Sequence, residues 1–101
     1  MKELNLTGTL PYLSPEVIRD EYWTSKTDIW SYGCVIYELC TYRLPFTGIN
    51  EENIISNIML NKPMPIPSQY SKDISLLLQL CLNKDPIQRP SASEILNMPC
   101  R

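Results

Sequence analysis

The stretch GTLPYLSPE, residues 8–16, carries more information about the fold than any other part of this chain. Residues 1–13 show neither a helical nor a strand period and are expected to form a loop. Pro15 suits the first turn of a helix, because the first N–H groups of a helix have no intrahelical partners. We therefore predict a short helix over residues 15–20. Taken alone, Ser14-Pro15-Glu16 indicates a helix start and nothing more.

The strongest helical pattern follows over residues 26–41. Ser25 is expected to cap this helix, and Asp28, three residues later, completes a capping-box-like pair at its positive end. Apolar residues then occur on nearly every side of the helix: Ile29, Trp30, Cys34, Val35, Ile36, Tyr37, Leu39 and Cys40. Because a helix that is apolar all round is normally buried all round, we predict that this helix is the centre of the domain.

Three more helices are predicted, and no segment has a convincing strand pattern. Asn50 can cap a helix over about residues 51–61, whose isoleucines and methionine at 54, 55, 58 and 59 share one face. Ser71 can cap the next, whose apolar residues 74, 77, 78 and 81 have the i, i+3, i+4, i+7 spacing. Asp85-Pro86 marks a turn. Ser91 and Glu94 form a capping box before the last helix, and Pro99 is expected to end it.

Size and composition restrict the class of protein. The chain has 101 residues, enough for one domain at most, and its hydrophobic content of 44% is too high for a disordered chain. A net charge of −2 argues against nucleic acid as a partner. No apolar run approaches the ~20 residues that a membrane span needs, and nothing resembles a signal peptide. We expect a soluble, intracellular, cytoplasmic protein with no membrane partner.

The cysteines do not indicate a metal site. The chain has four, at positions 34, 40, 81 and 100, and no histidine. None has the C-x-x-C spacing that is typical of zinc ligands, so no metal ligands are assigned. Cys34 and Cys40 fall inside the predicted central helix, where a free cysteine behaves as a small hydrophobic residue.

Three motifs, in this order, resemble the second half of the large lobe of a protein kinase. Ser14-Pro15-Glu16 is similar to the A-P-E element of that family, DIWSYG at residues 28–33 follows it, and Arg89-Pro90 lies near the end. The segments YLSPE, KTDIWS, YELCT and DPIQRPS most resemble the NIMA-related serine/threonine kinases. The resemblance covers residues 5–98. Each motif residue taken alone could have an ordinary structural role at a helix start, in the core or on the surface, but the joint order and spacing of these residues favour the kinase family.

This resemblance implies a mainly α, partial protein-kinase-like fold with about five helices. Residues 1–13 would be the end of the activation segment and the P+1 loop, which receives the substrate residue after the phosphorylated one. Residues 14–99 would be the helical large-lobe region. Gly8, Thr9 and Tyr12 would belong to the substrate-binding loop, and the family's hydroxyl at the Thr9 position bonds the catalytic aspartate.

The other motif residues have structural roles in the family. Glu16 would pair with Arg89 in a buried ion pair. The Asp28 carboxylate would accept backbone N–H bonds from the catalytic loop. Trp30 and Gly33 would pack the central helix, where glycine lets another backbone come close.

The catalytic motifs of the family do not occur in these 101 residues: there is no glycine-rich phosphate loop, V-A-I-K lysine, H-R-D or D-F-G. We therefore assign no catalytic residue and no bound cofactor to this chain, while ATP and Mg²⁺ are implied for the full-length family. The family's usual activating phosphosite corresponds to Asn5, which cannot be phosphorylated, and Thr7 is the nearest hydroxyl. Leu10 follows Thr9 where the family often has proline.

Two functions remain open from the sequence. The chain is part of a serine/threonine protein kinase and supplies the substrate-docking part of the large lobe, or it is a catalytically dead, kinase-derived binding module or truncated relic. The partners would be protein substrates or the missing kinase segments. The genomic sequence upstream of Met1 distinguishes the two, because an open frame with H-R-D and D-F-G favours the enzyme.

Overall fold

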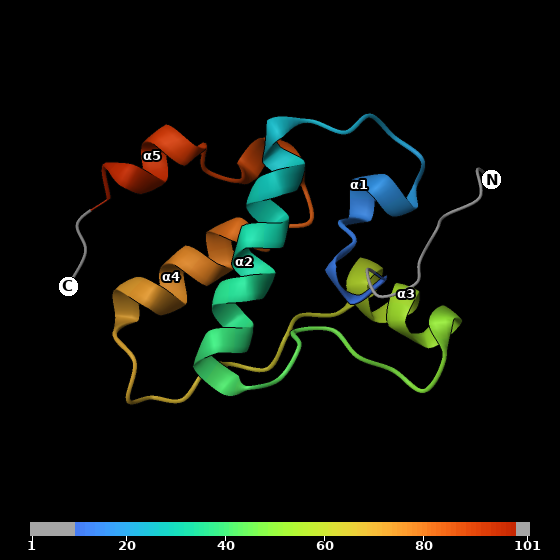
Figure 1. Ribbon diagram of the computed structural model, residues 1–101, viewed down its shortest axis with the longest axis horizontal. Helices are drawn as coiled ribbons and strands as arrows, with labels where there is room; N and C mark the ends of the chain where they lie inside the picture. The colour runs from blue at the N-terminus through green and yellow to red at the C-terminus, as the bar shows by residue number, and fades with distance from the viewer. Residues whose placement is uncertain (1–9, 99–101) are drawn as a thin grey trace.

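The computed structural model describes residues 10–98, and these residues are helical with no β-strand among them. Five α-helices and two short 3-10 helices follow one another: η1 (Leu10–Tyr12), α1 (Pro15–Ile18), α2 (Ser25–Thr41), α3 (Glu51–Leu60), α4 (Lys72–Cys81), η2 (Pro86–Gln88) and α5 (Ala92–Leu96). Helix α2 runs through the middle of the molecule, with α4 and α5 on one side and α1 and α3 on the other (Figure 1). The expected mainly α architecture around a central helix is confirmed.

The N-terminus of α2 differs from the prediction. Thr24, not Ser25, is the cap: its Oγ1 accepts a hydrogen bond from the Lys26 N–H at 3.1 Å. Thr27, not Asp28, is the reciprocal partner, because its Oγ1 accepts the Thr24 N–H at 3.1 Å. The backbone explains this shift, since Thr24 is extended (φ −138°, ψ 175°) whereas Ser25 already belongs to the helix. The Asp28 side chain is exposed on the first turn.

The other predicted caps are confirmed. Asn50 accepts from the Asn53 N–H, Ser71 from the Ile74 N–H, and Ser91 forms the capping box with Glu94. Helix α1 is shorter than predicted, because it ends at Ile18 and Asp20 has a left-handed backbone (φ 62°). The predicted loop contains one 3-10 turn, η1. The predictions for Asn5, Thr7, Gly8, Thr9 and Pro99 lie outside the described residues.

The core lies between α2 and its neighbours. Trp30 has no exposed surface and stacks on Phe46 with a ring-centroid distance of 5.5 Å. Gly33 lets α2 and α4 approach closely, because a Cβ at this position would lie 2.8 Å from the Cys81 Cβ. Cys34 is fully buried, and burial raises the pKa of its thiol to about 12, so the thiol stays protonated. The predicted close packing at Gly33 is confirmed.

Helix α2 is not buried on every side, so that prediction was wrong for the described part of the chain. Tyr32, Val35 and Leu39 are 41%, 47% and 66% exposed. Their i, i+3, i+7 spacing places them on one stripe of the helix. We call these three residues the open face of α2. Residues 10–98 do not cover it, whereas Trp30, Cys34 and Tyr37 on the same helix are buried.

Candidate functional site

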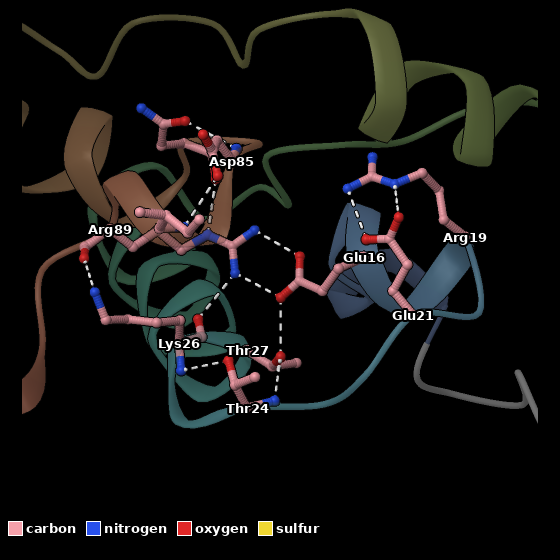
Figure 2. Close-up of polar contacts among 10 residues, drawn as sticks. Glu16, Arg19, Glu21, Thr24, Lys26, Thr27, Asp85 and Arg89 are labelled. Carbon is pink, nitrogen blue, oxygen red and sulfur yellow. Dashed lines mark hydrogen bonds and ion pairs between the residues drawn. The ribbon is translucent and has the colours of Figure 1, made fainter.

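A buried polar contact joins two segments that are far apart in the sequence. Glu16 on α1 and Arg89, which follows η2, lie 73 residues apart in the sequence. Nevertheless, Nη1 and Nη2 of Arg89 donate to Oε2 and Oε1 of Glu16, each at 2.7 Å. Both side chains are almost fully buried. Figure 2 shows the two planar groups facing each other edge to edge. The predicted buried ion pair is therefore confirmed, in the bidentate form that arginine and carboxylate favour.

Further hydrogen bonds complete the surroundings of this pair (Figure 2). The Thr27 hydroxyl donates to Glu16 Oε2 at 2.9 Å. Arg89 also donates to two carbonyls, from Nη1 to Lys26 at 2.9 Å and from Nε to Asn83 at 2.7 Å. In return, the Lys26 ammonium donates to the Arg89 carbonyl. The pair thus connects α1, the start of α2 and the segment after α4 through one buried network.

The electrostatics of Glu16 follow from this geometry. Burial by itself raises the pKa of the carboxyl group, because it disfavours the charged form. The hydrogen bonds from Arg89, from the backbone and from Thr27 act in the opposite direction and prevail, so the pKa lies below its ordinary value. Glu16 is therefore a buried carboxylate that stays ionised. The guanidinium of Arg89 is also 5.0 Å from the Trp30 ring centroid, which adds a cation–π contact.

A second contact fixes the end of the predicted substrate loop. The Tyr12 hydroxyl donates to Glu38 Oε1 on α2 at 2.6 Å. The bond to the Glu38 carboxylate raises the pKa of the Tyr12 phenol, and burial adds to this effect, so Tyr12 remains a donor. Between Tyr12 and Glu16, the Ser14 side chain is 1% exposed and Pro15 occupies the first turn of α1. Residues 12–16 are thus anchored at both ends.

The structure brings some of the predicted site residues together and leaves others apart. Glu16, Arg89 and Trp30 form one cluster, while Gly33 lies further along α2 against α4. Asp28 is exposed and takes no part in the cluster. Gly8 and Thr9 lie outside the described residues. The predicted binding roles of Gly8, Thr9 and Tyr12 therefore remain predictions.

Three participants were not identified from the sequence: Lys26, Thr27 and Glu38. Thr27 had a signal, because Thr24 and Thr27 have the three-residue spacing of a capping box. Lys26 accepts a hydrogen bond from Arg89 through its backbone carbonyl, and this group could not be identified from the sequence because every residue has one. Glu38 had no signal that distinguished it from an ordinary exposed helix carboxylate.

Within residues 10–98, no group of three or more histidine, cysteine, aspartate or glutamate side chains is arranged to hold a metal ion. Likewise, no helix within this range is long and apolar enough to cross a membrane.

Comparison with known proteins agrees with the geometry. The protein kinase domain family matches residues 2–100. Serine/threonine-protein kinase Nek11 from Homo sapiens is 39% identical over 94 residues, which cover 93% of this chain and 15% of that protein. Probable serine/threonine-protein kinase nek2 from Dictyostelium discoideum is 42% identical over 89 residues, covering 88% and 21%.

A third relative is the G2-specific protein kinase nim-1 from Neurospora crassa, which is 40% identical over 92 residues, 91% of this chain and 11% of that protein. The chain therefore spans about a fifth or less of the length of these relatives. The matched segment holds the A-P-E-like glutamate and its arginine, and the described residues form a partial kinase large lobe. This chain belongs to the protein kinase family, and its similarity to the NIMA-related serine/threonine kinases is confirmed.

Proposed function

We propose that this chain supplies the substrate-docking part of the large lobe of a cytoplasmic serine/threonine protein kinase. The observation that carries the proposal is the buried Glu16–Arg89 pair, with both N–O distances at 2.7 Å. It fixes α1, and therefore the residues directly before α1, to the base of the lobe. The Tyr12–Glu38 bond fixes the same segment to α2. Thr9, the predicted contact to the catalytic aspartate, is three residues from Tyr12.

Rigid anchoring at these points suits the needs of phosphoryl transfer. The acceptor hydroxyl must lie in line with the γ-phosphate, and most of the catalytic effect comes from positioning and from charge stabilisation. A loop held at its base by a buried bidentate pair positions a peptide better than a loop that moves freely. The lysine on the phosphates, the magnesium ligands and the base would come from other parts of the full-length kinase, which would also bind ATP and Mg²⁺.

The experiment is a chimera in which residues 1–101 replace the matching segment of the Dictyostelium kinase. Transfer of labelled phosphate from ATP to casein is measured after thermal unfolding has shown that the chimera is folded. Thr9→Ala should lower kcat/KM by about tenfold or more, as expected for loss of a hydrogen bond to a charged group. Arg19→Ala, at an exposed surface pair, is the matched control and should change little.

The proposal fails if the folded chimera binds ATP but does not phosphorylate casein. It also fails if Thr9→Ala has no larger effect than Arg19→Ala. Both comparisons use a folded protein, so a loss of activity through unfolding is recognised by the thermal transition and is not counted.

A binding module is the second candidate, and the open face of α2 favours it. Tyr32, Val35 and Leu39 offer an apolar stripe to a protein partner, either a substrate or another kinase segment. In this function the chain would act without phosphoryl transfer. A stable stoichiometric complex with a protein partner, together with a stop codon directly upstream of Met1, would favour the module over the enzyme.

A further inference from the structure

The segment that joins α3 to α4 contains three prolines at alternating positions, in the sequence KPMPIP over residues 62–67. We call residues 62–67 the proline strap. Each proline lacks a backbone N–H, has a fixed φ of about −65°, and holds the residue before it in an extended conformation. The strap contains neither helix nor strand and passes the C-terminal end of α2 on its way to α4 (Figure 1). These restraints favour a polyproline II conformation.

The exposure of the strap has the period expected for that conformation. A polyproline II helix has three residues per turn, so residues i and i+3 lie on the same edge. One edge, formed by Pro63 and Ile66, is half-buried. The other two edges are exposed: Lys62 with Pro65, and Met64 with Pro67. The strap thus packs one edge against the protein and turns two edges outward.

A hydrogen bond from the core holds the strap in place. The Tyr37 hydroxyl, on α2, donates to the Met64 carbonyl at 2.7 Å. The other carbonyls of residues 62–66 accept no hydrogen bond from a donor within residues 10–98, so they remain available as acceptors. A cavity of about 560 Å³ lies between the strap and α4, so the strap does not pack flush against that helix. The strap is therefore a preformed extended segment with free acceptors, and a partner would lose little affinity to ordering it.

The exposed edges of the strap combine apolar surface with one positive charge. The Met64 side chain is 66% exposed, and Pro65 next to it is exposed as well. Lys62 lies at the N-terminal end of the strap, on the same edge as Pro65. Within residues 10–98, Lys62 belongs to no ion pair. A partner that fits this surface needs an apolar groove and an acidic group near one end of it.

We propose that the proline strap is a docking site for a protein domain with an aromatic-lined groove bordered by acidic residues, of the kind that SH3 domains have. Such grooves bind polyproline II segments, whose preformed conformation keeps the entropic cost of binding low. Met64 and Pro67 would contact the groove from one edge and Pro65 from the next, while the acidic residues would attract Lys62. The site does not depend on the proposed kinase function, since it uses no residue of the predicted substrate loop.

One substitution should strengthen binding without disturbing the fold. Ser68→Pro would create, with Pro65, the Pro-x-x-Pro spacing that these grooves favour. Residue 68 is the second residue of a turn, which is closed by a 3.1 Å hydrogen bond from the Tyr70 N–H to the Pro67 carbonyl. Proline is favoured at the second position of such turns, so this variant should keep the native backbone.

The probe is a ¹⁵N-labelled SH3 domain with acidic residues beside its groove, titrated with the 101-residue chain. Its amide and indole shifts locate the contact, and the titration gives the Kd. Ser68→Pro should strengthen binding about tenfold and Pro65→Ala should weaken it about tenfold, the effect of roughly two buried methylene groups. Lys62→Glu should weaken binding about threefold, as expected for one exposed charge. Ile87→Ala, at an 80% exposed residue of η2, is the matched control and should leave the Kd unchanged.

Opposite effects of Ser68→Pro and Pro65→Ala cannot arise from a general loss of structure. If the unsubstituted chain shifts no groove residue of the SH3 domain, the proposal is overturned, even if Ser68→Pro binds. Equal losses for Ile87→Ala and Pro65→Ala would also overturn it, because they would show that any exposed apolar residue binds the probe. An unchanged Kd for Lys62→Glu would contradict the acidic border of the groove and so the class of partner proposed.

Discussion

Replacement of Arg89 by alanine removes four hydrogen bonds donated by one buried side chain: two to Glu16, one to the Lys26 carbonyl and one to the Asn83 carbonyl. The Glu16 carboxylate would then remain buried with only the Thr27 hydroxyl as a side-chain donor. Loss of one partner of a buried pair costs about 3–5 kcal/mol, because the remaining charge is uncompensated. We expect Arg89→Ala to lower the free energy of unfolding by that amount.

The assay is urea unfolding followed by far-ultraviolet circular dichroism at pH 7, with the preceding large-lobe segment of the Dictyostelium kinase added in trans so that the transition is cooperative. Small domains are stable by only about 0.05–0.15 kcal/mol per residue, so a loss of about 3–5 kcal/mol removes a large fraction of the stability expected for a chain of this length. Arg19→Ala is the matched control, because its pair with Glu21 is at the surface with side chains 40% and 53% exposed. We expect it to change stability by no more than about 0.5 kcal/mol.

A double variant, Glu16→Gln with Arg89→Met, separates the buried charge from the lost packing. Removing both charges should restore part of the stability, because a neutral amide is far less costly to bury than an unpaired carboxylate. Equal, small effects of Arg89→Ala and Arg19→Ala would refute the reasoning. They would show that the Glu16 site is open to water in solution.

Three more predictions follow from the same contacts. The folded-state pKa of Glu16 is below its ordinary value of 4.5, so the stability that the ionised carboxylate contributes is present above pH 4.5 and is lost as the pH falls through the folded-state pKa. The urea concentration at the unfolding midpoint should therefore decrease when the pH is lowered below 4.5, and a constant midpoint would contradict this prediction. Gly33→Ala should destabilise by about 1–3 kcal/mol, because its Cβ would lie 2.8 Å from the Cys81 Cβ; Ser93→Ala, exposed on α5, serves as the control. The isolated chain should neither bind Mg-ATP nor phosphorylate protein, since it contains no phosphate-binding motif; saturable micromolar heat in a calorimetric titration, or labelled casein, would disprove this.

Local signals in the sequence predicted the helices well, because helix starts depend on neighbouring residues. Asn50, Ser71 and Ser91 each bond a backbone N–H within three residues of themselves. For α2 the same reasoning placed the cap at Ser25, one residue after the observed cap, Thr24. Three hydroxyl side chains that could cap a helix, Thr24, Ser25 and Thr27, lie within four residues at the start of α2, and only the backbone angles show which residue is still extended.

Long-range contacts required more than local patterns. The Glu16–Arg89 pair was predictable only because the kinase resemblance relates two residues 73 positions apart. The Tyr12–Glu38 bond and the position of Lys84 over Phe46 have no such motif, and side-chain type alone does not place them. The prediction that α2 is buried on every side failed for another reason. Apolar periodicity shows which faces of a helix are expected to be buried, but it does not show which segment packs against each face.

The open face of α2 gives the most direct test that the chain is one part of a kinase large lobe. If Tyr32, Val35 and Leu39 normally contact another segment of the lobe, the isolated chain should be helical but loosely packed. It should then bind a dye such as anilinonaphthalene sulfonate and unfold over a broad temperature range. The measurement is the thermal transition of the 101-residue chain with and without the preceding large-lobe segment of the Dictyostelium kinase, added in trans. We predict that the added segment sharpens the transition and abolishes dye binding. A sharp, cooperative transition of the chain alone, without dye binding and unchanged by the segment, would contradict the kinase-lobe function and favour an independent binding module.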